Sequence, residues 1–370
     1  MRHALLALLL ALTSSACTAA VRDCAWPAWE AFKTQMVSAD GRVIDASSPR
    51  SITTSEGQSY ALFFALVAND RATFARLLRW THNNLAGGDL GARLPAWLWG
   101  RSDDHRWQIL DANNASDADL WIAYALLEAG RLWDQPDYTR LAERLLWRSA
   151  AESLLWMPDV GLVLLPGRLG FINPTGTRIN PSYSVPQLFA RFAQVDALWA
   201  QVDHDTQRAL IDAAPQGFVP DWRLRSWQDG WKPDAQTGLL GSYDAIRSYL
   251  WIGMMAADAP GRAALQQRLA PMAAKVAALG RVPEKIDTQT GSVSGTPSSG
   301  FAAALLPLLA ATQQDDALAA QRAHLHQHPA DANAYYAQVL TLFGHGWDQG
   351  RYRFAANGNL QPAWAQACPP

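Results

Sequence analysis

Residues 119–129 read Asp-Leu-Trp-Ile-Ala-Tyr-Ala-Leu-Leu-Glu-Ala, a segment that opens on a polar residue and is then apolar on nearly every side. A helix that is hydrophobic all round is a buried helix. Similar segments, each opening with small, polar or aromatic residues, begin at Ser59, Ser182, Ser242, Gly300 and Ala334. The sequence therefore predicts six buried helices.

The spacing of these segments predicts their arrangement. The first four begin about 60 residues apart, the fifth follows at 300 and the last after a shorter interval. Sixty residues accommodate two helices and their loops, and charged amphipathic segments at 70–82 and 138–151 lie between the apolar ones. We therefore expect an all-α fold, an (α/α)6 barrel of six inner and about six outer helices. A stacked solenoid is the alternative, although its repeats would be shorter and more uniform.

Composition fits one large globular domain. The chain has 370 residues, of which 49% are hydrophobic and 17% charged, and this excludes a disordered or fibrous chain. A net charge of −2 provides no basic surface for a phosphate backbone, so we expect no nucleic-acid partner. Since no linker divides the chain, we expect a single domain over residues 21–370.

The N-terminus has the three-part pattern of a secretory signal peptide, which we assign to residues 1–20. Arg2 supplies a positive charge, residues 4–12 are apolar, and small residues follow. This run is too short to span a bilayer, and no later apolar segment is long enough, so we expect no transmembrane segment in the mature chain. The prediction is a periplasmic or secreted protein; lipid anchoring at Cys17 is the alternative.

The number and positions of the cysteines are consistent with an exported protein. Once the signal is removed, Cys24 and Cys368 remain at opposite ends of the chain, and we expect them to form a disulfide. Two free thiols are the alternative. The chain contains no CxxC or HExxH motif, and we expect neither a metal nor a cofactor.

Chemistry is expected where the inner helices begin. Inner helices of such a barrel run the same way, so their N-terminal residues line one cleft. Those residues are Glu56, Asp117, Asp119, Tyr183, Asp244 and Tyr335. No G-x-S-x-G elbow, no cysteine–histidine pair at these positions and no glycine-rich nucleotide motif is present. Carboxylates beside aromatic residues are suited to breaking a glycosidic bond, and the 17 tryptophans to stacking on sugar rings.

Each of these acids also has a purely structural interpretation. Glu56 could complement the dipole of its helix, or act as an acid if burial raises its pKa. Asp117 and Asp119 could cap a helix or form part of a metal loop. Asp244 could simply pair with Arg247 three residues on, or be kept ionised by it as a general base.

Three blocks of sequence resemble one family. Residues 115–133, 54–60 and 242–247, which carry Asp117, Glu56 and Asp244 respectively, are similar to the signature blocks of glycoside hydrolase family 8. Residues 94–100, 180–183, 282–285 and 340–347 resemble one branch of it, the periplasmic endoglucanases encoded with bacterial cellulose synthase. The resemblance covers the chain from Trp26 to Cys368.

The resemblance implies an (α/α)6 barrel and an inverting endo-β-1,4-glucanase. Carried over by position, Glu56 is the proton donor and Asp244 the base that activates water. Asp117 is the third essential carboxylate, which we assign to binding and distorting the sugar because inversion needs no nucleophile on the enzyme. Tyr243 and Arg247 would position the water and the base. The remaining subsite candidates are Tyr60, Trp97, Asn114, Tyr183 and Tyr335.

The implied partner is a β-1,4-glucan chain such as cellulose, with the cellulose synthase or export complex as a further candidate. Within the family, chitosan, lichenan and xylan remain alternative substrates, because the acid and base do not identify the sugar. The alternative from another class is a non-catalytic glucan-binding subunit of the export complex.

Overall fold

The computed structural model describes residues 25–367. The predicted signal peptide at 1–20, Cys17 and both cysteines of the predicted disulfide, Cys24 and Cys368, lie outside the described residues.

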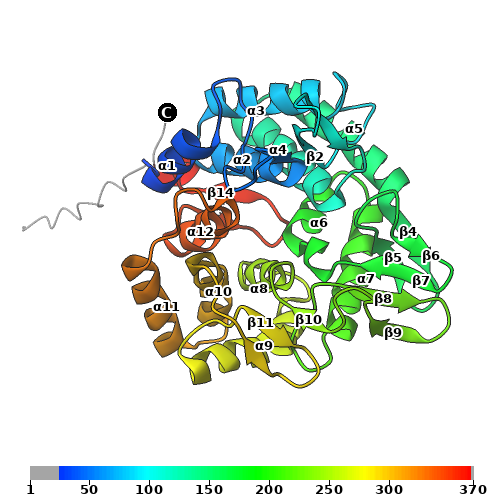
Figure 1. Ribbon diagram of the computed structural model, residues 1–370, viewed down its shortest axis with the longest axis vertical. Coiled ribbons are helices and arrows are strands. Elements are labelled where there is room, and N and C mark those ends of the chain that lie inside the picture. The colour runs from blue at the N-terminus through cyan, green and yellow to red at the C-terminus, as the bar shows by residue number, and fades with distance from the viewer. Residues whose placement is uncertain (1–24, 368–370) are drawn as a thin grey trace, which may run out of the picture.

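Six helices surround the centre of the molecule, as the sequence predicted (Figure 1). They are α2 (Ser55–Val67), α4 (Ser116–Trp133), α6 (Pro186–Phe192), α8 (Ala245–Gly253), α10 (Ser299–Ala311) and α12 (Tyr335–Asp348). A second layer lies outside them, and its members alternate with the inner helices along the chain. They are α1 (Pro27–Met36), α3 (Arg71–Asn84), α5 (Pro136–Ser153), α7 (Leu198–Ala213), α9 (Arg262–Leu279) and α11 (Asp315–Gln327). This is the (α/α)6 barrel.

The two layers differ in sequence as expected. Helix α2 buries twelve of its thirteen residues, whereas α3 is amphipathic and buries only five. Both begin with a side-chain cap, because the backbone N–H of Gly57 donates to Thr54 and that of Thr73 to Asp70. Burial on all sides makes α2 an inner helix, and one apolar face makes α3 an outer one.

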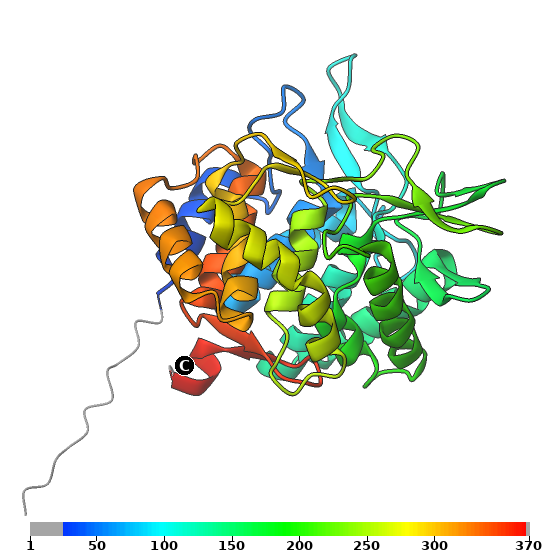
Figure 2. The ribbon, with the colours of Figure 1, turned by 90° about the horizontal axis from the view of Figure 1, so that it is seen from below.

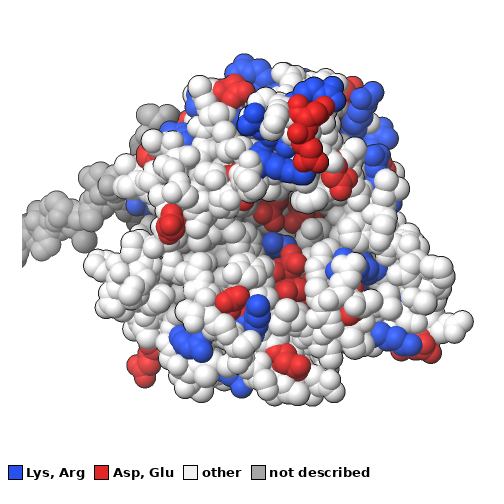
Figure 3. All heavy atoms as spheres, in the orientation of Figure 1, with Lys and Arg blue, Asp and Glu red and all other residues white. Residues whose placement is uncertain are grey.

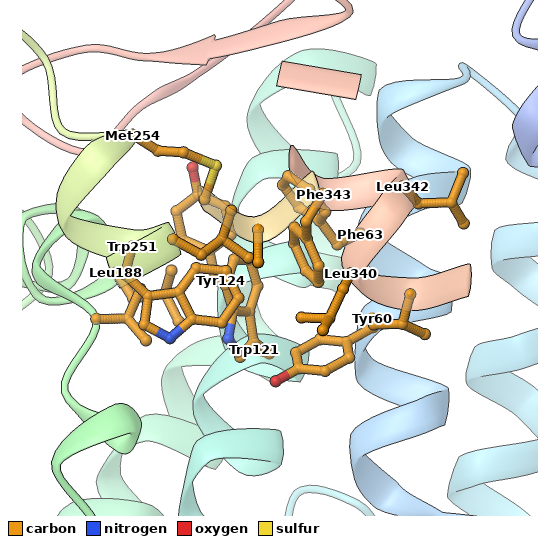
Figure 4. Packing of buried hydrophobic residues seen from close by; sticks show 14 of the residues in the cluster. Tyr60, Phe63, Trp121, Tyr124, Leu188, Trp251, Met254, Leu340, Leu342 and Phe343 are labelled. Carbon is orange, nitrogen blue, oxygen red and sulfur yellow. The ribbon is translucent and has the colours of Figure 1, made fainter. Parts of the chain in front are cut away.

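Aromatic side chains close the ring of inner helices (Figure 4). Phe343 on α12 lies edge-on to Tyr60 on α2, with ring centroids 5.0 Å apart, and stacks on Phe63 at 5.3 Å. Across the barrel, Trp121 on α4 contacts Trp251 on α8 at 5.3 Å. The first and last inner helices therefore pack together, and the core is continuous around the ring.

The sequence did not predict the strands. The described residues contain fourteen strands of two to five residues, paired antiparallel in five small sheets, and one hairpin, β2–β3, stands out from the barrel in Figure 2. The first sheet comprises β1 (Thr53–Thr54), β2 (Leu98–Arg101) and β3 (Trp107–Asp111). The second comprises β4 (Leu154–Met157) and β5 (Gly161–Leu164), and the third β6 (Ile172–Asn173), β7 (Gly176–Ile179), β8 (Arg223–Ser226) and β9 (Gly230–Pro233). The others comprise β10 (Leu240–Gly241), β11 (Lys285–Asp287) and β12 (Val293–Ser294), and β13 (Tyr352–Phe354) with β14 (Leu360–Pro362).

Two short helices complete the described part of the chain, η1 (Pro181–Tyr183), a 3₁₀ turn ahead of α6, and α13 (Ala363–Ala367). Among residues 25–367, no helix is both long and apolar enough to cross a membrane.

A buried ion cluster fixes the C-terminal hairpin. Glu128 on α4 is fully buried and accepts hydrogen bonds from Arg131, from Arg191 on α6 and from the backbone N–H of Leu360 on β14. Two guanidinium groups and one amide therefore compensate for the burial of one carboxylate.

Candidate active site

The predicted carboxylates lie at the starts of three inner helices. Glu56 and Asp117 occupy the first turns of α2 and α4, and Asp244 is the N-cap residue of α8. Tyr335 begins α12, and Tyr183 ends the 3₁₀ turn ahead of α6. In Figure 3 the face seen in Figure 1 is hollowed near its middle, and acidic and basic atoms lie in that hollow. The barrel thus brings together residues that are distant in sequence.

One guanidinium joins two of these carboxylates. Arg247 Nη2 donates to Asp244 Oδ1 at 2.7 Å, and Nη1 lies 3.3 Å from Glu56 Oε2. The same side chain donates to the hydroxyls of Ser182 at 3.0 Å and Tyr336 at 3.3 Å. Arg247 is buried, so little water screens these contacts. The interpretation of Asp244 and Arg247 as a local ion pair is therefore incomplete, because this arginine also reaches across the barrel to α2.

Glu56 has the environment of a general acid. Its Oε1 accepts a hydrogen bond from the Tyr335 hydroxyl at 3.1 Å. Burial raises the pKa of Glu56, and Arg247 and Tyr335 offset part of that rise. Gly57 makes room for this contact, since a Cβ there would lie 3.2 Å from the Tyr335 hydroxyl oxygen. A carboxyl with a raised pKa keeps its proton closer to neutral pH and can give it to a leaving group.

Asp117 is the most enclosed of the three acids, at 4% exposed. Its Oδ1 accepts the backbone N–H of Ala118 at 2.8 Å. Burial, followed by the charge of Glu56, raises the pKa of Asp117 to about 7. Because the two acids influence each other, their protons belong to the pair rather than to either residue alone.

Asp244 is held by residues that the sequence did not single out. Trp222 donates its indole Nε1–H to Asp244 Oδ2 at 3.0 Å. Asp221 accepts three backbone N–H groups around Asp244, and Tyr336 donates its hydroxyl to the backbone oxygen of Tyr243. The sequence carried one usable signal, the Tyr335–Tyr336 pair at the start of an inner helix. Nothing in the pattern around 221–222 connects it to Asp244.

The candidates Tyr60 and Asn114 are embedded in protein. Tyr60 is 1% exposed and packs against aromatic rings of α4, α8 and α12. Asn114 Nδ2 donates to Asp119 Oδ2 at 2.7 Å, and its Oδ1 accepts the backbone N–H of Arg168 at 2.9 Å. These contacts shape the loop that leads into α4. Asp119 itself is fully buried and faces Asn114, so it does not join the acids of the cleft.

The other aromatic candidates are accessible. Trp97 and Tyr183 are half-buried, and Tyr243 is 47% exposed with its ring edge-on to Phe301. The Tyr183 ring lies 5.9 Å from the Arg247 guanidinium, beside the carboxylates. All three side chains keep part of their surface exposed.

The site combines an acid whose pKa is raised with a second carboxylate that carries two strong donors. One guanidinium, that of Arg247, contacts both carboxylates. This arrangement suits proton donation from one side of a bond and water activation from the other.

Known proteins share both the sequence and the fold. The family description "Glycosyl hydrolases family 8" matches residues 3–350. An Escherichia coli K12 protein named "Endoglucanase" is 49% identical over 345 residues, which are 93% of each chain. A Xanthomonas axonopodis protein of the same name is 47% identical over 96% of this chain and 94% of its own. The crystal structure of an endo-1,4-D-glucanase from Vibrio fischeri is 42% identical and superposes with a TM-score of 0.86 over 92% of this chain and 100% of that one. With a match of this extent and with acids at the predicted helix starts, the chain belongs to glycosyl hydrolase family 8.

Proposed function

We propose that the protein is an inverting endo-β-1,4-glucanase. The observation that supports this proposal is the contact of Arg247 with both Glu56 and Asp244, two carboxylates from the starts of different inner helices. The relatives named endoglucanase support the choice of glucan as substrate.

In the proposed reaction both bond changes occur in one step. Glu56 donates its proton to the glycosidic oxygen as the bond to the anomeric carbon breaks. Asp244 removes a proton from a water molecule, whose oxygen bonds to that carbon from the opposite face. Asp117 binds and distorts the sugar at the cleavage point and forms no covalent bond. Tyr183, Tyr243 and Trp97 contact neighbouring sugar units, and Arg247 holds the base.

We further propose that the protein acts in the periplasm on cellulose leaving the synthase complex. The support is the signal-like pattern at residues 1–20 and the resemblance to the cellulose-synthase branch of the family. Lichenan, xylan and chitosan remain alternative substrates of the same mechanism.

One experiment tests activity and location together. The chain, expressed with its own N-terminus, should be recovered from the periplasmic fraction without residues 1–20. It should release reducing ends from carboxymethyl cellulose faster than from lichenan, xylan or chitosan.

Glu56→Gln should lower kcat by several orders of magnitude with little loss of glucan binding, because an amide cannot donate the proton. If the Glu56→Gln variant were as active as the wild type, Glu56 could not be the acid. Binding without any release of ends would favour the non-catalytic subunit, and recovery in the membrane pellet would favour a lipid anchor at Cys17.

A further inference from the structure

Two consecutive residues ahead of β8 hold the catalytic base from two directions. The first, Asp221, is 7% exposed, and its Oδ1 accepts the backbone N–H groups of Ser242 at 2.8 Å, Asp244 at 3.0 Å and Ala245 at 2.8 Å. These N–H groups lie at the start of α8, where a helix leaves its first donors without partners. Asp221 therefore caps α8 from another part of the chain and fixes the backbone of Asp244.

The second residue, Trp222, fixes the side chain of Asp244. Its Nε1–H donates to Oδ2 at 3.0 Å, while Arg247 donates to Oδ1 at 2.7 Å. Two donors on different oxygens, from different elements, set the plane of the carboxylate. Each oxygen of an ionised carboxylate can accept more than one hydrogen bond. Acceptor capacity therefore remains for the attacking water.

The indole is itself held in place by Phe171, which precedes β6, and by Arg178 on β7. The Phe171 ring stacks on it with centroids 6.0 Å apart and planes 2° apart, and the Arg178 guanidinium lies 4.0 Å from its ring centroid. Arg178 is in turn paired with Asp234, Nε to Oδ1 at 2.7 Å. Each contact restricts how the ring can turn, and with it the direction of the N–H.

We propose that Trp222 is a positioning residue for the base. Its indole N–H orients the Asp244 carboxylate toward the attacking water. This rests on the proposed function, since it requires Asp244 to be the base. A base held in the productive geometry contributes to the rate of the chemical step. The loss of this hydrogen bond should therefore appear in kcat rather than in KM.

The variant Trp222→Phe tests this directly. Phenylalanine keeps an aromatic ring against Phe171 and Arg178 but has no N–H. The matched control is Trp227→Phe, because Trp227 directly follows β8 and donates its Nε1–H to the backbone oxygen of Asn173 at 3.0 Å rather than to Asp244. On a soluble cello-oligosaccharide we expect Trp222→Phe to lower kcat roughly 10- to 100-fold, as for a lost hydrogen bond to a charged group. KM should stay within about twofold, and Trp227→Phe should match the wild type.

An activated substrate separates the base from the acid. A dinitrophenyl cello-oligosaccharide has a leaving group that needs no proton, so it should restore much of the activity of Glu56→Gln. Attack by water still requires the base. Trp222→Phe and Asp244→Asn should therefore remain impaired on this substrate.

Several outcomes would overturn the proposal. Equal kcat values for Trp222→Phe and Trp227→Phe would remove Trp222 from the reaction, and a higher KM at unchanged kcat would make it a surface for stacking sugar. Recovery of Trp222→Phe on the activated substrate would place it on the acid side. If Trp222→Phe does not fold, Arg178→Met is the second variant, because it keeps the Trp222 N–H but removes the guanidinium that restricts the Trp222 ring. It should lower kcat about two- to fivefold. An unchanged kcat in Arg178→Met would then refute the proposal.

These results also separate this proposal from the proposed function. A wild-type protein that releases no reducing ends, or an Asp244→Asn variant as active as the wild type, would refute the proposed function. An active wild type, an inactive Asp244→Asn and an unaffected Trp222→Phe would overturn only the role of Trp222.

Discussion

At the scale of single residues, the environment of Glu56 predicts how activity depends on pH. A general acid must be protonated, so activity falls as pH rises through its pKa. Burial raises the pKa of Glu56, and the alkaline limb of kcat/KM should therefore lie above the ordinary value of about 4.3. The limb reports Glu56 and Asp117 as a pair, because the charge of Glu56 also raises the pKa of Asp117.

Removal of the Tyr335 hydroxyl tests the direction in which its hydrogen bond shifts the pKa of Glu56. This hydroxyl donates to Glu56 and lowers its pKa by stabilising the ionised form. Tyr335→Phe should therefore move the alkaline limb to higher pH, because the ionised form of Glu56 loses a hydrogen bond. A pH–rate profile on a soluble glucan measures this. The expected direction would be contradicted by a limb that moves to lower pH.

The residues of the site differ in how far sequence could predict them. Glu56, Asp117 and Asp244 follow from one rule, because each stands where an apolar inner helix begins. Trp222 follows no such rule, since its contact with Asp244 depends on how the chain ahead of β8 packs against α8. The side chain of Asn114 is engaged with Asp119 and Arg168, and sequence alone could not separate this loop contact from sugar binding.

At the scale of elements, helices were predictable and strands were not. An inner helix such as α4 shows burial on all sides over 18 residues, which is a long signal. Strand β1 has two residues and pairs with β2 through Thr53 and Trp99, far apart in the sequence. Two residues cannot display a period of two, so the pairing is decided by tertiary contacts.

Trp97 and Trp99, at the start of the first sheet, differ in their contacts. The backbone N–H and C=O of Trp97 are bonded to Asn113 and Ser55, and its side chain is half-buried. Trp99 is packed, with Trp107 stacked on it at 5.2 Å and the Arg42 guanidinium 4.3 Å from its ring. Trp97→Ala keeps the backbone bonds and should weaken oligosaccharide binding by roughly 1–3 kcal/mol, the value of a large buried aromatic surface.

Trp99→Ala is the matched control for this prediction. It should lower the melting temperature and leave affinity near that of the wild type. Isothermal titration with an inactive Glu56→Gln background and thermal unfolding of each variant measure both quantities. The reverse pattern, with lost stability at Trp97 and lost affinity at Trp99, would exchange the roles of the two side chains.

At the scale of the whole molecule, closure of the barrel creates the site. In the ring of inner helices, α2 and α8 are separated by two helices on either side (Figure 1). Their N-terminal residues Glu56 and Asp244 are joined by Arg247. The Tyr60–Phe343 contact closes this ring, and the buried Glu128 cluster ties α4, α6 and β14 together. The order of the apolar segments along the chain predicted this ring, because six helices that alternate with outer ones have few other ways to bury every side.

The position of the two acids on opposite walls predicts the stereochemistry of the product. Glu56 and Asp244 come from α2 and α8, which two other inner helices separate on either side of the ring, and Arg247 contacts both. We expect this placement to leave space for a water molecule beside the base. Inverting enzymes hold their carboxylates about 6.5–9.5 Å apart for this reason. Cleavage of a β-1,4 bond should therefore release an α-configured reducing end first, which proton NMR detects within the first minutes, before mutarotation mixes the anomers. The β-anomer appearing first, or a glycosyl group trapped on Asp117, would instead require Asp117 to act as a nucleophile, against the enclosed position in which it accepts the backbone N–H of Ala118.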